Sequence, residues 1–174
     1  MTISLVLGGA RSGKSNYAEN LAKHSKQPVV YVATAQVHDE ATAQRISAHQ
    51  QSRPAQWKTV ECPLQLGAVL EQYATAGNTV LVDCLTMWVT NLLCEEDAES
   101  QLVDAQQDFF NALKNIRGDV IFVSNEVGMG IIPMGALTRD YVDIAGRLHQ
   151  DIAAQADRVE LIVAGLPLVL KDNT

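Results

Sequence analysis

The chain has 174 residues, with 13 Lys and Arg against 20 Asp and Glu, a formal net charge of −7, and 47% apolar residues. This composition predicts a single folded domain over 1–174, because the apolar residues can bury enough surface to offset the chain entropy. The acidic balance argues against nucleic-acid binding, and no apolar run approaches the ~20 residues that span a bilayer.

The N-terminus and the cysteines favour a cytoplasmic protein. The apolar start at residues 3–7 has no basic segment before it and is too short for a secretory signal. Three cysteines without CxxC spacing favour neither a disulfide framework nor a zinc site. We therefore expect reduced thiols in the cytoplasm.

Continuous apolar runs alternate with longer amphipathic stretches along the whole chain. In chain order they predict strand 3–7, helix 14–25, strand 29–33, helix 41–51, helix 64–73, strand 79–83, helix 85–93, helix 100–117, strand 120–124, helix 136–156, strand 160–164 and, after a turn at 165–167, edge strand 168–170. Apolar strands separated by helices indicate a parallel sheet covered on both faces. We expect an α/β three-layer sandwich whose mostly parallel sheet ends in an antiparallel hairpin, with loops at 95–99 and 125–135.

A phosphate-binding loop lies between the first strand and the first helix. Residues 8–15, GGARSGKS, match GxxxxGK[ST] in the strand–helix context that this motif requires. The glycines let backbone N–H groups turn toward phosphate, and the helix N-terminus adds partial positive charge. The expected nucleotide contacts are Gly8, Gly9, Ala10, Arg11, Ser12, Gly13, Lys14 and Ser15. A glycine-rich turn that binds no nucleotide is the alternative, and Arg11 could instead face solvent.

Catalytic and metal-binding roles within this motif follow from its chemistry. Lys14 would neutralise the β- and γ-phosphate oxygens, and Ser15 would hold Mg²⁺. Asp83 ends the apolar strand 79–83, the Walker-B arrangement in which a carboxylate supports Mg²⁺ directly or through water. The alternative is that Asp83 caps the next helix. Together these features indicate a P-loop NTPase of the RecA-like type.

Arg45, His49 and Arg53 are spaced to share one face if residues 41–51 and their flank form a helix. Two guanidiniums beside an imidazole repel one another unless an anion lies between them, so the face suits a polyphosphate. The positive charge would also keep His49 neutral and nucleophilic. From spacing alone, a solvated polar face is the favoured interpretation.

Motifs of other P-loop classes are missing. No NKxD sequence is present, and the one DxxG match, residues 143–146, falls inside a predicted helix, which argues against a regulatory GTPase. The arginines outside the loop are scattered rather than gathered in a lid, as small-molecule kinases usually have. The phosphate loop alone therefore leaves a nucleotide-dependent transferase or hydrolase.

Six motifs narrow this choice. They are GGARSGKS at 8–15, VATAQ at 32–36, RIxxHxxxRP at 45–54, TVEC at 59–62, LVDCLTMWVTNLL at 81–93 and SNEVGMGI at 124–131. In this order and spacing they resemble the bifunctional adenosylcobinamide kinase / adenosylcobinamide-phosphate guanylyltransferase family, over essentially the whole chain.

The resemblance implies two reactions in the nucleotide-loop assembly of cobalamin. The hydroxyl of adenosylcobinamide takes the γ-phosphoryl group of ATP or GTP, and the resulting phosphate then takes GMP from a guanylylated histidine to give adenosylcobinamide-GDP. The histidine of the family motif is His49, whereas His24, His38 and His149 lie outside it. A monofunctional kinase, with His49 only a phosphate contact, and a GTP-binding regulatory or assembly module stay open as alternatives.

Further site residues and partners also follow from the resemblance. The family places nucleotide contacts after the second strand and after the histidine, here Thr34, Ala35, Gln36, Gln50, Gln51, Ser52 and Arg53. Arg45, on the face that suits a polyphosphate, is a further expected nucleotide contact. Glu61 and Asp83 match acidic positions associated with GTP, and Glu61 could read guanine N1–H or simply be an exposed strand-end residue. The family forms rings, so we expect a homotrimer with contacts from the hairpin or long helices. Residues 125–128 either line the cobinamide pocket or shape a turn, and Trp57 and Trp88 are expected to pack.

Overall fold

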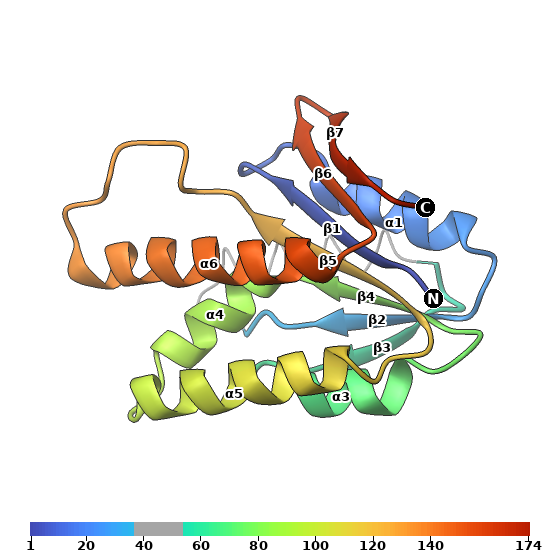
Figure 1. The fold of residues 1–174 in the computed structure, drawn as a ribbon, viewed down its shortest axis with the longest axis horizontal. Helices are drawn as coiled ribbons and strands as arrows, with labels where there is room; N and C mark the ends of the chain where they lie inside the picture. The colour runs from blue at the N-terminus through green and yellow to red at the C-terminus, as the bar shows by residue number, and fades with distance from the viewer. Residues whose placement is uncertain (37–53) are drawn as a thin grey trace.

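The computed structural model describes residues 1–36 and 54–174, and within them seven strands form one sheet (Figure 1). The strands are β1 Ile3–Gly8, β2 Val29–Ala33, β3 Lys58–Glu61, β4 Thr79–Asp83, β5 Asp119–Asn125, β6 Arg158–Val163 and β7 Leu166–Asp172. Their order is β3-β2-β4-β5-β1-β6-β7, with β1 to β6 parallel and β7 antiparallel to β6. The predicted parallel sheet with a C-terminal hairpin is confirmed.

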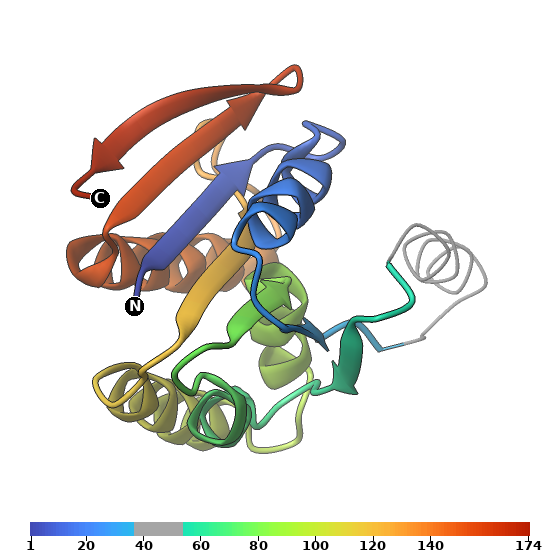
Figure 2. The same ribbon diagram turned by 90° about the vertical axis from the view of Figure 1, so that its right-hand side faces the viewer.

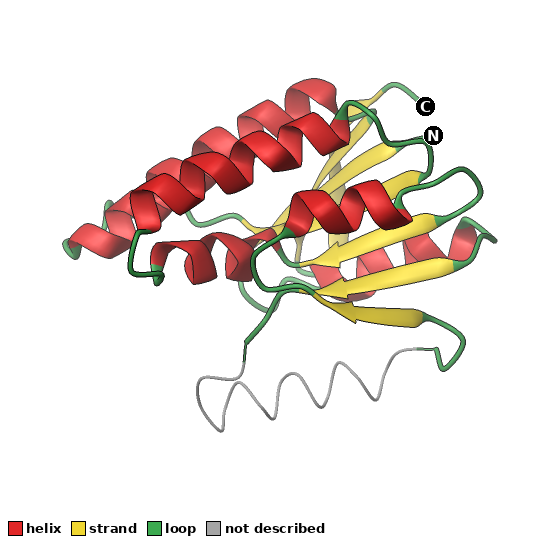
Figure 3. Cartoon of the chain, turned by 90° about the horizontal axis from the view of Figure 1, so that it is seen from below, coloured by secondary structure: helices red, strands yellow, loops and turns green. Residues whose placement is uncertain are grey.

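Helices cover both faces of the sheet, which gives the expected three layers (Figures 2 and 3). One face carries α3 Leu66–Tyr73, α4 Leu85–Leu93, α5 Ala98–Leu113 and α6 Ala136–Gln155, and the other carries α1 Lys14–His24. Among the helices of the two described ranges, none has the length and hydropathy to cross a bilayer.

The core has one apolar cluster on each side of the sheet, because successive strand residues point to opposite faces. Leu5 and Leu7 belong to the larger cluster, whereas Val6 belongs to the cluster under α1. The larger cluster centres on Phe109, whose ring centroid lies 5.3 Å from that of Trp88 and 5.4 Å from that of Phe122. Trp88 is fully buried and donates its indole N–H to Leu64 O at 2.7 Å, so its predicted packing role is confirmed.

Several element boundaries differ from the sequence pattern. The short strand β3 was not among the expected elements, because only Val60 of its four residues is apolar, and pairing with β2 holds it in the sheet. The helix expected at 100–117 runs from Ala98 to Leu113, so the expected loop at 95–99 is partly helical. After α5 the chain turns, and the N–H groups of Arg117 and Gly118 both donate to Ala74 O.

The C-terminal hairpin is tighter than predicted. Its turn consists of Ala164 and Gly165 alone, at φ 52° and 80°, and two successive positive φ values are typical of two-residue hairpin turns. Strand β7 therefore begins at Leu166 rather than at residue 168. Pro167 is tolerated there because β7 is an edge strand. The helix predicted at 41–51 lies outside the described residues.

Candidate nucleotide-binding site

The phosphate loop joins β1 to α1, as the motif predicts. Gly13 is the N-cap of α1 at φ 95°, and a Cβ at Gly8 would lie 2.7 Å from Ile162 O and collide with Ser12 Oγ. Inside the loop, Ser12 N–H and Lys14 Nζ both donate to Gly9 O at 3.2 Å. The loop is therefore closed on itself at the N-terminus of α1, the end of a helix that attracts anions.

Neighbouring strands hold the loop in place. Glu126 N–H, just after β5, donates to Gly8 O at 3.1 Å, and Gly165 N–H in the hairpin turn donates to Ser12 O at 2.8 Å. A Cβ at Gly13 would lie 3.2 Å from Gly165 Cα. The hairpin turn and the end of β5 thus support the loop from two sides.

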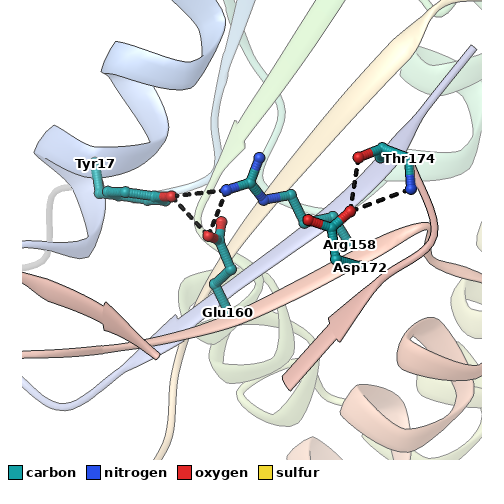
Figure 4. Close-up of polar contacts among 5 residues, drawn as sticks. All are labelled: Tyr17, Arg158, Glu160, Asp172 and Thr174. Atoms are coloured by element: carbon teal, nitrogen blue, oxygen red, sulfur yellow. Dashed lines mark hydrogen bonds and ion pairs between the residues drawn. The ribbon is translucent and has the colours of Figure 1, made fainter. Parts of the chain in front are cut away.

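A polar network fixes α1 against β6 (Figure 4). The Tyr17 hydroxyl donates to Glu160 Oε1 at 2.6 Å, and Arg158 Nη2 donates to the same oxygen at 2.7 Å and to the Tyr17 hydroxyl at 3.2 Å. Glu160 is fully buried, and a buried carboxylate is costly unless it is paired. Burial and the Glu160 carboxylate raise the pKa of Tyr17, so the phenol remains the donor. This network orients the helix that the phosphate loop begins.

Lys14 and Asp83 meet at the carboxyl edge of the sheet. Burial lowers the pKa of the Lys14 ammonium, and the nearby Cys84 and Asp83 oppose that shift. The Tyr31 hydroxyl donates to Asp83 Oδ2 at 2.9 Å and so aims the carboxylate. Asp83 is not the cap of α4, because the N-cap residue is Cys84 and no side-chain capping bond is present there. The helix-capping alternative for Asp83 therefore has no support in the structure.

The ends of β2 and β3 continue the same edge. Thr34 is fully buried, and its hydroxyl donates to Cys84 O at 2.7 Å and accepts from Cys84 N–H at 2.8 Å. It thus joins the end of β2 to the end of β4. Glu61 ends β3 in register with Ala33 and is exposed. Ala35 and Gln36 follow Thr34 and are half-buried.

The structure therefore brings together the phosphate loop, Lys14, Ser15 and Asp83, with Thr34 and Glu61 further along the edge. The other predicted site residues, Arg45, His49, Gln50, Gln51, Ser52 and Arg53, lie outside the described residues. Their roles stay predictions, as do the nucleotide contacts of the described residues.

The sequence interpretation missed a second polar group beside the site. His149 Nε2 lies 2.7 Å from Ser124 Oγ, and Asn125 N–H donates to Thr86 Oγ1 at 2.8 Å. Burial lowers the pKa of His149, and the Glu126 carboxylate opposes that shift. The available signal was helical spacing, since His149 shares the buried face of α6 with Ala145 and Ile152.

An open cavity of about 600 Å³ lies elsewhere, at the start of α5. Its lining includes Glu96, Asp97, Glu99 and Asp104. Because these carboxylates would repel phosphate, the cavity is a poor nucleotide site. The edge that carries Lys14 and Asp83 therefore remains the candidate nucleotide site.

With this geometry in place, the comparisons with known proteins decide the family. The family described as cobinamide kinase / cobinamide phosphate guanyltransferase matches residues 4–170. The chain belongs to this family. The resemblance stated from the six motifs is thereby confirmed.

Relatives and a solved structure agree with this assignment. The bifunctional adenosylcobalamin biosynthesis protein CobP of Pseudomonas aeruginosa is 50% identical over 167 residues, which cover 96% of each chain. The CobU proteins of Salmonella typhimurium and Escherichia coli, which carry the same description, are each 41% identical over 179 residues, covering 96% of this chain and 98% of theirs. A solved protein from Pyrococcus horikoshii is 9% identical at TM-score 0.55, covers 99% of this chain and 87% of its own, and supports the fold alone.

Proposed function

We propose that this member of the cobinamide kinase / guanylyltransferase family carries out both reactions of its family. It would phosphorylate adenosylcobinamide with ATP or GTP and then transfer GMP from GTP to the new phosphate. The observation that carries the proposal is the 50% identity with a relative described as bifunctional, over 96% of both chains. The phosphate loop, closed between β1 and α1, supplies the nucleotide chemistry that both reactions need.

In the kinase step, the loop N–H groups and Lys14 would hold the β- and γ-phosphates. The hydroxyl oxygen of cobinamide attacks the γ-phosphorus in line, the bond to the β-phosphate oxygen breaks, and the nucleoside diphosphate leaves. Each charge-assisted contact to the transferred group would contribute about 1.5–3 kcal/mol. Lys14 is well placed for this, because its ammonium lies at the phosphate loop, hydrogen-bonded to Gly9 O, and within electrostatic reach of Asp83.

The residues at this edge fit Mg²⁺. Ser15 in the first turn of α1 and Asp83 at the end of β4 offer oxygen donors, and Mg²⁺ usually takes one or two protein oxygens together with substrate phosphates. The Tyr31 hydroxyl holds the Asp83 carboxylate in position for this. When bound, Mg²⁺ would neutralise charge on the phosphate oxygens.

In the guanylyltransferase step, neutral His49 would attack the α-phosphorus of GTP, and pyrophosphate would leave. The phosphate of cobinamide phosphate would then displace the histidine and take the GMP. A phosphoramidate intermediate divides one difficult displacement into two easier ones. Arg45 and Arg53 would steady the phosphates, and the exposed Glu61 carboxylate would accept from guanine N1–H and the 2-amino group.

The proposal also includes the remaining nucleotide contacts, the oligomeric state and the cellular compartment. We expect Thr34 to Gln36 and Gln50 to Ser52 to line the nucleotide. We also expect a homotrimer that acts in the cytoplasm. These expectations rest on the family resemblance, together with the position of β2 at the carboxyl edge of the sheet.

The intact mass of the protein after incubation with GTP and Mg²⁺ tests the proposal. We expect an acid-labile gain of one GMP that maps to His49, and no AMP gain from ATP. His49→Ala should lose the adduct but keep cobinamide phosphorylation. The matched control His24→Ala, at an exposed position of α1, should keep both.

Other outcomes would identify the alternatives. No adduct, with cobinamide still phosphorylated by the unaltered chain, would leave a monofunctional kinase. GTP binding with neither adduct nor phosphorylation would indicate a regulatory or assembly module. Equal loss of both activities in His49→Ala would refute the proposed division of roles.

A further inference from the structure

The segment that follows β5 exposes an unusual number of apolar side chains. Residues 127–134, the apolar loop, carry Val127, Met129, Ile131, Ile132 and Met134, all exposed; Ile131 is 97% and Met134 96% accessible to solvent. Figure 1 shows the chain between β5 and α6 extending away from the sheet. Exposed apolar groups gathered in one place are typical of a binding surface.

Polar groups at both ends hold this loop in shape. Glu126 Oε1 accepts from Gly128 N–H at 2.7 Å, and Glu126 Oε2 accepts from Met129 N–H at 3.3 Å. At the other end, Arg139 Nη1 donates to Pro133 O at 3.2 Å and also contacts Met134 O. The backbone is thus tied to the chain's own side chains, while the apolar side chains stay outside the core.

The apolar loop begins beside the phosphate loop. Asn125 pairs in register with Gly8, and Glu126 N–H donates to Gly8 O. A ligand that rests on the apolar loop therefore lies next to the site where a nucleotide phosphate would bind.

We propose that the apolar loop is the platform for the corrin macrocycle of cobinamide. The inference rests on the proposed function, since cobinamide is the substrate of that reaction. A corrin is a broad, flat ring whose faces and methyl-bearing rim are largely apolar, and its reactive hydroxyl sits at the end of a short arm. The body of the ring must therefore rest close to the phosphate loop, and flexible Met and Ile side chains can follow its irregular surface.

Another copy of the chain is a poorer ligand for the apolar loop than the corrin, because a second exposed apolar surface is available for contacts between subunits. Strand β7 leaves Leu166, Leu168, Val169 and Leu170 exposed on the open edge of the sheet. An open strand edge with apolar side chains is a ready template for pairing with another chain. The hairpin therefore offers a subunit contact, and the apolar loop, next to the phosphate loop, is left for the substrate.

Equilibrium dialysis of cobinamide against the double variant Ile131→Ser/Ile132→Ser tests this inference. Both side chains are exposed, so the fold should tolerate the change. Because two apolar contacts are lost, we expect binding at least about tenfold weaker and a KM for cobinamide raised by a similar factor. The kcat of phosphorylation and the GMP adduct formed with GTP alone should stay unchanged. The matched control Val103→Ser, at an exposed position of α5, should behave like the unaltered chain.

The outcomes separate this inference from the proposed function. Unchanged cobinamide binding in the double variant would overturn the platform. Weaker binding together with a smaller mass by light scattering would also overturn it, because the loop would then be a subunit contact. If the unaltered chain binds cobinamide but does not phosphorylate it, the proposed function fails, and weaker binding in the double variant would still support the platform. If the unaltered chain does not bind cobinamide at all, both fail.

Discussion

At the scale of single residues, the glycines of the phosphate loop are required for different physical reasons. Gly8 is required for space, since a Cβ would approach Ile162 O to 2.7 Å, and Gly13 is required for its φ of 95°. Among the described residues, a Cβ at Gly9 meets no atom within 4 Å. Contacts and backbone conformation within the protein therefore explain the first and last glycines of the loop, while the space at Gly9 is open for a ligand.

His149 makes the stability of the fold depend on pH. Its pKa is lowered by burial in the folded chain, so between the folded and unfolded values the unfolded chain binds more protons. The contribution of His149 to stability is therefore fully present above the unfolded pKa of about 6.5 and is lost as pH falls through the folded value.

We predict that His149→Gln weakens the acid sensitivity of folding. Unfolding free energies from denaturant titrations at pH 7.5 and 5.5 should fall less for this variant than for the unaltered chain, because a neutral side chain takes up no proton. The control His24→Gln, at an exposed position, should keep the full decrease. An equal decrease in all three proteins would contradict the role given to His149.

At the scale of elements, α3 and α5 approach each other closely enough to need a glycine. A Cβ at Gly67 would lie 2.8 Å from the carbonyl carbon of Asp108 and 3.0 Å from Phe109 N. A Cβ at Gly146, in the middle of α6, would meet no atom of another described element within 4 Å. Gly67 is therefore needed because the neighbouring helix leaves no room for a side chain, whereas Gly146 has room for one.

We predict opposite effects of alanine at these two positions. Gly67→Ala should destabilise the fold by about 1–3 kcal/mol, because two backbones must move apart. Gly146→Ala should stabilise it by about 0.5–1 kcal/mol, because alanine lowers the entropy cost of a helix interior. Denaturant midpoints measure both changes. A Gly67→Ala variant as stable as the unaltered chain would refute the close packing of α3 on α5, and a destabilising Gly146→Ala would refute the free space at Gly146.

The observed helices and strands also show how accurately local sequence patterns predict the bounds of these elements. Long periodic segments such as α6 and apolar runs such as β4 were predicted within a residue of their bounds. Strand β3 was missed because its sequence, KTVE, has little apolar character and depends on pairing with β2. The start of β7 was misplaced because the positive φ values of Ala164 and Gly165 concentrate the turn in two residues.

At the scale of the whole molecule, the order of the strands determines where the candidate binding surfaces lie relative to one another. Strand β1 lies between β5 and β6, so the phosphate loop is flanked by the apolar loop on one side and the hairpin on the other. The β7 edge of the sheet is the natural place for another subunit, since the outer side of β7 has no neighbouring strand among the described residues and its leucines are exposed.

We predict that Leu168→Lys/Leu170→Lys breaks the expected trimer. Two charges on the exposed edge would oppose pairing between subunits, so light scattering should give a monomer mass. Val103→Lys, an exposed position on α5, should leave the trimer intact. A trimer that survives the hairpin change would move the interface elsewhere, and a monomeric unaltered chain would refute the trimer itself.

Local chemistry in the sequence was enough to predict the phosphate loop, the alternation of strands and helices, and the family to which the chain belongs. These depend on residues within a few positions of one another, and glycine spacing, apolar periodicity and short motifs record such neighbours directly. Only the tertiary structure brought Tyr17 to Glu160 across 143 residues, and the apolar loop to the edge of the phosphate loop. Such contacts follow from the order in which the strands pair, and no spacing within the sequence encodes that order.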